Sequence, residues 1–205
     1  MNNILNGDCL NRGTGLLLIE AINSNPNGDP DRESDPRTRQ DGCGEISPVS
    51  FKRKLRDLVE NKESPVWKEI SAELKLPEKG FDILESKQTK REDVRKLELG
   101  DFLSKYWDAR VFGTTFLEEK TEQVDSFIKT GVVQFGLGVS ISPVQIERMT
   151  TTKVLAVEDD KDKGMAPLGF RVVSYGVYTM PFFVNATAAQ QTNCTPKDIE
   201  LLLRL

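Results

Sequence analysis

The sequence predicts an α+β domain, because strand-like alternation and helix-like periodicity occur in one chain of 205 residues. Strand patterns are clearest at residues 15–22 and 131–142. Helix starts are clearest where Ser or Thr precedes Pro, at Ser47, Ser64 and Thr195. A chain of this length can bury a core without disulfides or metal ions, so we expect one domain over residues 1–205.

Composition narrows the possible functions. The chain has no histidine, which excludes histidine-activated nucleophiles and histidine-ligated metals. The three cysteines are odd in number and far apart, which argues against a disulfide framework or a zinc ribbon. No apolar run approaches the roughly 20 residues of a membrane span, and residues 1–12 lack a signal-peptide pattern. We therefore expect a cytoplasmic protein and predict no metal, cofactor or membrane partner.

The first strand and the loop after it dominate the N-terminal part. Residues 15–22 contain the uninterrupted apolar run Leu16–Ile19, which predicts a buried strand. The turn sequence Asn23–Gly28 ends it, and a polar loop continues to Glu45. Loops of this length without regular structure are usually functional or disordered, and its prolines and glycines favour a defined path for part of it.

A basic helix is predicted after this loop. Ser47 is its expected N-cap and Pro48 its first residue. The apolar residues Phe51, Leu55, Leu58 and Val59 form the predicted inner stripe, and Lys52, Arg53 and Arg56 the outer face. Between Arg37 and Arg56 six basic residues outnumber two acidic ones, although the whole chain carries −4. Most charged helix faces are simply solvated, but cations clustered in this way favour contacts with the phosphates of a polyanion.

The remaining elements follow in order. A helix from Ser64 is expected to bury Val66, Trp67, Ile70 and Leu74. Residues 81–99 show no clear period and predict a mobile excursion, and residues 97–107 predict a short helix. Two strands within residues 150–178 predict a long hairpin with a charged tip at 158–164. The helix from Thr195 is expected to bury Ile199, Leu202 and Leu203.

Six phrases in register then resemble one family, the Cas-seven superfamily, whose members form the backbone of type I CRISPR surveillance (Cascade) complexes. The similarity is greatest to the type I-C or I-B branch. The phrases are NSNPNGDPD, DPRTRQDGCGEISPVSFKRKLRD, DARVFG, TGVVQFGLGVSISPV, LGFRVVSYGVY and NATAAQQTNCTPKDIELL.

The resemblance implies an RNA-recognition-motif-like (ferredoxin-like) palm, with a finger-like insertion at residues 61–130 and a thumb hairpin at 150–178. It implies a noncatalytic subunit that grips the backbone of the CRISPR guide RNA and packs against its neighbours. The implied partners are guide RNA, other Cas-seven copies, a Cas-five-like subunit, the large subunit and, indirectly, target DNA.

The family's RNA-gripping regions carry over onto eleven residues of this chain. In the family a pair of basic residues often follows the glycine of the second hairpin arm, whereas Phe170-Arg171 keeps only one. The implied RNA-binding residues are Asn25, Asn27, Arg37, Arg39, Lys52, Arg53, Arg56, Ser140, Ser142, Lys153 and Arg171.

Two alternatives remain open from the sequence. Family members usually continue beyond the helix that begins at Thr195, so the resemblance implies a missing last palm strand. That favours, as an alternative, a truncated mimic, possibly a virus-encoded anti-CRISPR, that enters or blocks a Cascade complex. The aspartates of the loop also allow a metal-dependent ribonuclease. Because type I backbone subunits do not cleave RNA, Asp29 is given no catalytic role and the chain is not expected to be an enzyme.

Overall fold

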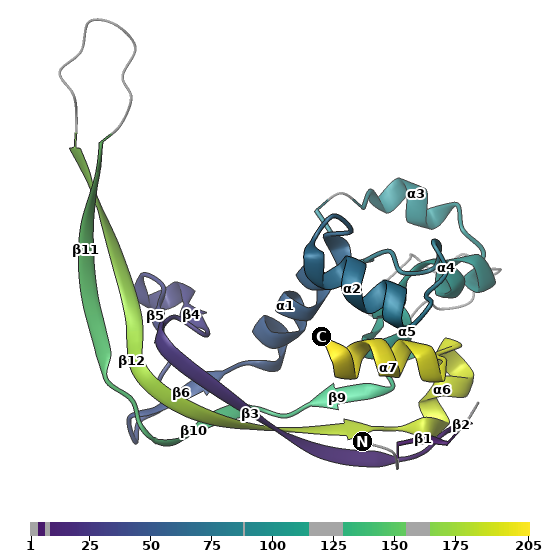
Figure 1. Ribbon diagram of the computed structural model, residues 1–205, viewed down its shortest axis with the longest axis horizontal. Helices are drawn as coiled ribbons and strands as arrows, with labels where there is room; N and C mark the ends of the chain where they lie inside the picture. The colour runs from purple at the N-terminus through teal and green to yellow at the C-terminus, as the bar shows by residue number, and fades with distance from the viewer. Residues whose placement is uncertain (1–3, 7–8, 88, 115–128, 155–164) are drawn as a thin grey trace, which may run out of the picture. The chain divides into compact units, whose positions relative to one another are not determined.

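The computed structural model describes residues 4–6, 9–87, 89–114, 129–154 and 165–205 (Figure 1). Helices and antiparallel strands are mixed, which confirms the predicted α+β class. The chain divides into two compact units. The first unit comprises residues 1–15, 51–135 and 182–205, and the second comprises residues 16–50 and 136–181. Three elements contain residues of both units: β3 (Gly13–Ser24), α1 (Pro48–Glu60) and β12 (Met165–Val184).

The second unit is built on an antiparallel sheet, in which β12 lies between β11 and β10, and β10 also pairs with β6. β3 pairs with β12 as well. The loop that follows β3 has structure of its own, because β4 and β5 pair with Gly28 opposite Pro36. The further elements of this unit are β4 (Gly28–Asp29), η1 (Pro30–Arg32), β5 (Asp35–Pro36), β6 (Cys43–Ile46), β10 (Gly138–Pro143) and β11 (Ile146–Val154).

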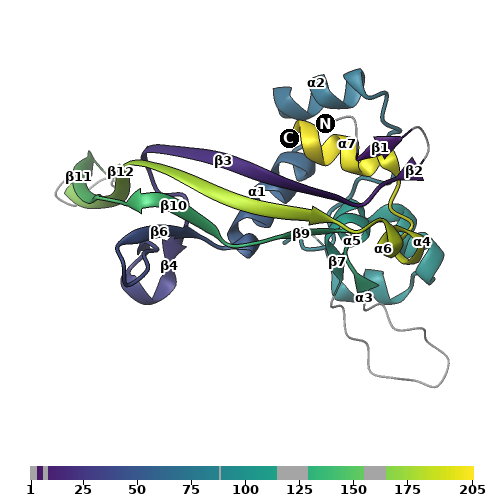
Figure 2. The ribbon, with the colours of Figure 1, turned by 90° about the horizontal axis from the view of Figure 1, so that it is seen from below.

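The first unit holds most of the helices (Figure 2). β9 pairs with the end of β12, Phe135 lying opposite Phe182. The short pairs β1–β2 and β7–β8 complete the strands. Its elements are β1 (Leu5–Asn6), β2 (Cys9–Leu10), α2 (Pro65–Glu73), α3 (Arg91–Arg95), α4 (Leu99–Lys105), α5 (Trp107–Phe112), β7 (Gly113–Thr114), β8 (Lys129–Thr130), β9 (Val133–Phe135), α6 (Ala186–Thr192) and α7 (Pro196–Arg204).

The predicted helix starts are confirmed by their caps. The Ser47 hydroxyl accepts from the Ser50 N–H at 3.2 Å, and the Ser64 hydroxyl accepts from the Trp67 N–H at 3.1 Å. Thr195 and Asp198 form a capping box at the start of α7. These caps supply partners for helix-end N–H groups, which is why their signal is local and readable from sequence.

The first strand is present but is not buried on both faces. In β3 exposure alternates along residues 13–20, and Leu18 remains 72% exposed while Ala21 is buried. Leu16 and Ile22 are exposed as well. The prediction of a buried strand was therefore wrong for one face, because an unbroken apolar run reads the same whether one or both faces are covered.

The predicted strand at residues 131–142 is two strands, β9 and β10. The Gly136 N–H donates to the Pro181 carbonyl at 2.8 Å, and a Cβ at Gly136 would lie 2.8 Å from the Pro181 ring. A Cβ at Gly138 would similarly lie 2.9 Å from the end of Met180. The bare face of these glycines is thus occupied by the chain's own β12, as close approach to a glycine in a strand requires.

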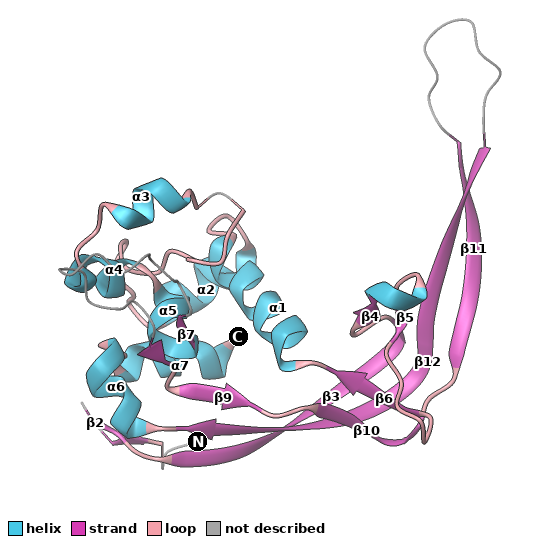
Figure 3. Cartoon of the chain, turned by 180° about the vertical axis from the view of Figure 1, so that it is seen from behind, coloured by secondary structure: helices cyan, strands magenta, loops and turns pink. Residues whose placement is uncertain are grey.

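The long hairpin is confirmed between β11 and β12, whose pairing runs from Ile146–Val173 to Val154–Met165 (Figure 3). The charged tip expected at residues 158–164 lies outside the described residues. No helix within the described part of the chain combines the length and apolarity needed to cross a membrane.

The segment expected to be an excursion contributes to the core of the first unit. Val94, Phe102, Leu103, Tyr106 and Ala109 form one buried cluster. Phe81 and Ile83 are buried as well. The weak periodicity of residues 81–99 arises because short turns, rather than one long helix, present these side chains.

Candidate nucleic-acid interface

The predicted RNA-binding residues are divided between the two units. Lys52, Arg53 and Arg56 belong to the first unit. The second unit contains the other eight, which are Asn25, Asn27, Arg37, Arg39, Ser140, Ser142, Lys153 and Arg171.

In the first unit, Arg56 is buried rather than presented to solvent. Its Nε donates to Oδ2 of Asp108 at 2.8 Å, and its Nη2 lies 3.0 Å from Glu85. Residues three apart on a helix differ by about 300°, so Arg56 lies only about 60° from the buried Val59. The prediction that Arg56 belongs to an outer basic face was therefore wrong.

Lys52 and Arg53 are also engaged within the first unit. The Lys52 ammonium lies 5.2 Å from the centroid of the Phe112 ring. Burial, followed by the nearby Arg56 charge, lowers the pKa of Lys52. Arg53 forms ion pairs with Asp57 and Glu60, and hydrogen bonding to Asp57 raises its pKa. The basic residues of α1 therefore have partners within the chain, which reduces the surface they offer to phosphates.

In the second unit, Asn27 is a structural residue. It is buried, and its Oδ1 accepts from both the N–H and the hydroxyl of Ser47, each at 2.8 Å. Its Nδ2 donates to the Gly28 carbonyl at 3.0 Å. Asn27 therefore fixes the turn after β3 to the N-cap of α1, and positions its neighbours rather than presenting its own amide.

Ser140 has a similar structural part. Its buried hydroxyl accepts from the Gly44 N–H at 2.8 Å and donates to the Ser142 carbonyl at 2.6 Å. Ser142 itself is an exposed residue of β10. Lys153 lies in β11 opposite Ala166, but its side chain is outside the described residues.

Arg37 and Arg39 lie on the loop with accessible guanidinium groups. The Arg37 guanidinium lies 3.9 Å from the carboxylates of both Asp29 and Glu45. The backbone N–H of Arg37 donates to the Asn27 carbonyl at 2.9 Å. Arg39 lies 3.9 Å from Asp41. Exposed ion pairs at this distance contribute little stability, so a phosphate could replace these carboxylates at small cost.

Arg171 forms the best-connected part of this surface. Its Nη1 donates to the Glu33 carbonyl at 2.8 Å, its Nη2 pairs with the Glu33 carboxylate, and its Nε lies 3.0 Å from Asp35. Bonding to Glu33 raises the pKa of Arg171 and lowers that of Glu33. Arg171 also borders a pocket of about 530 Å³ that includes Asn25 and the exposed ring of Phe170. The Asn25 amide donates to the Ser34 carbonyl at 2.7 Å.

Arg148 is a basic residue that sequence reasoning missed. The register of the hairpin places it directly opposite Arg171, and its Nη2 lies 3.5 Å from Asp35. Like charges opposite each other in a sheet repel unless an anion lies between them, and Asp35 is that anion here. The pairing register of the hairpin could have identified Arg148, because once Ile146 is paired with Val173, Arg148 must lie opposite Arg171. The second hairpin arm has one basic residue, and the first arm supplies another.

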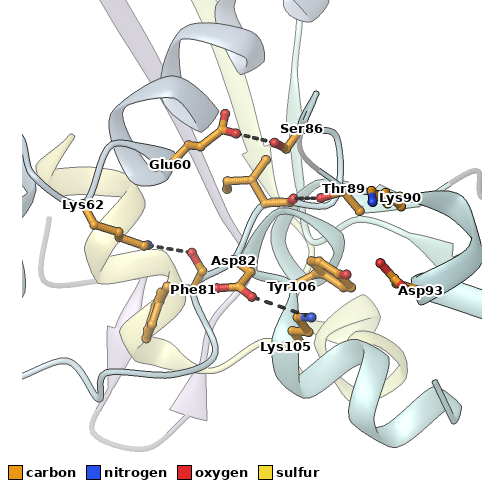
Figure 4. Close-up of a pocket in the computed structure, with 11 residues that line it drawn as sticks. Glu60, Lys62, Phe81, Asp82, Ser86, Thr89, Lys90, Asp93, Lys105 and Tyr106 are labelled. Carbon is orange, nitrogen blue, oxygen red and sulfur yellow. Dashed lines mark hydrogen bonds and ion pairs between the residues drawn. The ribbon is translucent and has the colours of Figure 1, made fainter. Parts of the chain in front are cut away.

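A separate pocket of about 340 Å³ lies in the first unit (Figure 4). The Lys62 ammonium donates to the Phe81 carbonyl at 2.7 Å and lies 3.6 Å from the centroid of the Trp67 ring. Lys105 lies 4.0 Å from Asp82 across the same pocket. Three lysines and three carboxylates line this pocket, so opposite charges are balanced along it.

The described residues contain no group of three or more carboxylate, cysteine or histidine side chains placed to hold a metal ion. The carboxylates of the loop instead face arginines, as Asp29 faces Arg37 and Asp35 faces Arg171. This arrangement gives no support to the hypothesis of a metal-dependent ribonuclease.

The comparisons with known proteins agree on one group. The family model described as CRISPR-associated protein Cas7 matches residues 11–205. A curated relative, CRISPR-associated protein Cas7 of Haloferax volcanii, is 28% identical over 228 aligned positions, covering 94% of this chain. The chain spans 62% of the length of that relative.

Two solved structures are also similar. One, titled "CRISPR RNA-guided surveillance complex", has a TM-score of 0.42 and 18% identity, covering 93% of this chain and 58% of its own. The other, titled "CRISPR RNA-guided surveillance complex, pre-nicking", has a TM-score of 0.46 and 20% identity, covering 93% of this chain and 68% of its own.

Proposed function

The chain belongs to the CRISPR-associated protein Cas7 family, and we propose that it is a noncatalytic backbone subunit that binds guide RNA in a type I surveillance complex. In this proposal the sheet is the RNA-recognition-motif-like palm, the β11–β12 hairpin the thumb, and residues 61–130 the finger-like region. The partners would be CRISPR guide RNA, neighbouring Cas7 copies and the other Cascade subunits, and the setting cytoplasmic. No feature of the described residues favours the alternative of an inhibitory mimic.

The observation that carries the proposal is the set of arginines in the second unit. Arg37 and Arg39 lie on the loop, and Arg148 and Arg171 face each other across the hairpin. Guanidinium groups suit phosphate because their planar donors can bind two of its oxygens at once. Such contacts grip the RNA backbone without reading its sequence, which leaves the bases for pairing.

Direct RNA binding tests this function. The purified chain is titrated into a fluorescently labelled single-stranded RNA carrying a CRISPR repeat, and anisotropy is measured over a series of salt concentrations. The test variant combines Arg37→Gln with Arg39→Gln. It should bind more weakly, and the slope of log affinity against log salt should fall by roughly 1.4, about 0.7 for each phosphate that is no longer neutralised.

A control variant with the same loss of charge combines Lys68→Gln with Lys96→Gln. Both lysines belong to exposed ion pairs of the first unit, with Glu63 and Asp93. This control should bind as the parent does. The proposal is wrong if the parent fails to bind RNA at low salt, or if both double variants lose the same affinity. Cleavage of the RNA by the parent in the presence of Mg²⁺ would contradict the noncatalytic assignment.

A further inference from the structure

Two carboxylates contact Arg171, and they differ in how firmly they are held. The side chain of Asp35 is 20% exposed and is shared with Arg148, whereas that of Glu33 is 80% exposed. The Glu33 carboxylate therefore reaches Arg171 from solvent, while Asp35, in β5, is held between Arg148 and Arg171. Exposed ion pairs have small net free energies, so of the two carboxylates Glu33 is the one that another anion can replace.

Most of the N–H donors of Arg171 already face an acceptor. Its Nε is ion-paired with Asp35, its Nη1 donates to the carbonyls of Arg32 and Glu33, and its Nη2 holds the Glu33 carboxylate. A phosphate that binds two oxygens needs two neighbouring N–H donors of the planar fork, and each such pair on Arg171 already faces at least one of these acceptors, so one acceptor must leave first. The two arginines and two carboxylates of this cluster also sum to zero charge, which removes its long-range attraction for RNA.

The loop backbone is held independently of the Glu33 carboxylate. Glu33 and Ser34 both have left-handed backbone angles, with φ of 50° and 65°. The Ser34 N–H donates to the Asp29 carbonyl at 2.8 Å, and the Ser34 carbonyl accepts from Asn25 at 2.7 Å. These bonds keep the loop in place when the carboxylate turns away. The adjoining pocket of about 530 Å³, lined by both Glu33 and Arg171, leaves room for a phosphate to enter.

We propose that the Glu33 carboxylate is a built-in competitor that occupies the phosphate position on Arg171 and must be displaced before the RNA backbone can bind there. The inference rests on the proposed RNA-binding function and adds a means of restraint to it. A polyanion that makes only one contact gains little by displacing Glu33. A guide RNA that also contacts Arg37 and Arg39 can offset the free-energy cost of displacing Glu33 with those other contacts. Displacement lowers the affinity of both ligands by the same factor, and only a ligand with further contacts keeps useful affinity after it.

The test compares two substitutions that remove the same charge from the same loop. Glu33→Gln removes the competitor but keeps the carbonyl that Arg171 contacts, so the loop should stay folded. Asp31→Asn is the matched control, because Asp31 is exposed in η1 and its carboxylate does not contact Arg171 among the described residues. Binding of a labelled single-stranded RNA is measured by anisotropy at one fixed salt concentration.

Glu33→Gln should tighten RNA binding by about two- to five-fold, which is what loss of one exposed ion pair allows, and Asp31→Asn should leave it nearly unchanged. In an Arg171→Gln background the gain from Glu33→Gln should disappear, because the two side chains act on one contact. Equal tightening by Glu33→Gln and Asp31→Asn would overturn the inference while leaving RNA binding established. A gain that persists without Arg171 would also overturn it. Absence of RNA binding in the parent would instead remove the proposed function, and the competitor with it.

Discussion

The Arg56 guanidinium and the Asp108 carboxylate form a buried ion pair, with Nε 2.8 Å from Oδ2 and only 5% and 1% of the two side chains exposed. Asp108 also accepts from the N–H groups of Leu84 and Glu85, at 2.7 and 3.2 Å. One carboxylate thus joins α1, α5 and the chain segment after Phe81. The pair therefore stabilises the interior of the first unit and is not available at its surface.

Replacing Asp108 by Ala should destabilise the protein by about 3–5 kcal/mol, because a buried guanidinium loses its main counter-charge. The matched control is Asp57→Ala, which removes an exposed carboxylate paired with Arg53 and should cost about 0–1 kcal/mol. Urea denaturation followed by circular dichroism measures both. Equal costs would mean that the buried pair contributes no more than the exposed one. Charge reversal at Arg56 is accordingly a test of folding, and not of RNA binding.

Asn27→Ala should destabilise the second unit by about 1–3 kcal/mol, since the Ser47 N–H loses a buried acceptor. Asn27→Asp, which keeps an acceptor oxygen, should recover part of the loss. Asn25→Ala removes an exposed hydrogen bond and should have a smaller effect. Thermal unfolding of the three variants gives the comparison. If the alanine variant at position 27 is as stable as the parent, the amide does not hold the turn to α1.

The hydroxyl of Tyr178 is buried without a hydrogen-bond partner within the described structure, and burial raises its pKa. Tyr178→Phe should therefore stabilise the protein by about 1 kcal/mol, because an unsatisfied buried hydroxyl carries an uncompensated desolvation cost. Tyr175→Phe, at an exposed position of the same strand, should change stability little. Urea titrations distinguish the two, and a clear loss of stability in Tyr178→Phe would contradict the prediction.

Burial lowers the pKa of Lys62 from 10.5 to about 8. Between these values the folded side chain is neutral while the unfolded one is protonated, so unfolding takes up a proton and the free energy of unfolding rises with pH. That stability is fully present above about pH 10.5 and is lost as the pH falls through about 8. Lys62→Met should flatten this rise, measured by urea denaturation between about pH 7.5 and 10.

Lys68 provides the control for this titration, because its ammonium is exposed beside Glu63. Lys68→Met should keep the pH dependence of the parent. If the parent's stability does not rise more steeply than that of Lys62→Met over this interval, Lys62 remains protonated in the folded protein.

Local signals in the sequence predicted much of the secondary structure. Helix starts at Ser47, Ser64 and Thr195 were predicted because each cap involves residues close in sequence. The hairpin was predicted because residues that favour β-strands lie on both sides of a charged segment. Family membership was predicted from six phrases in register and is confirmed by the match over residues 11–205.

What the sequence could not supply depended on partners distant in the chain. Arg56 looks like a surface cation until Asp108, 52 positions later, is placed beside it. Arg110 is similar, since its buried partner Asp198 is 88 positions away. The break between β9 and β10 depends on Pro181, which lies against Gly136. Whether one or both faces of β3 are buried depends on which distant side chains pack on it. Local patterns of charge and hydrophobicity do not identify such long-range pairs.

β12 has a consequence for how the chain is made. It pairs with β3, β9, β10 and β11, so among the described strands β3 (Gly13–Ser24) has no sheet partner until Met165–Val184 has left the ribosome. At about 5–20 residues per second, the apolar β3 waits roughly 10–30 seconds during synthesis. The unpaired edge of this apolar strand is therefore a liability for the nascent chain. We expect the yield of folded protein to depend on chaperones that shield this strand during translation.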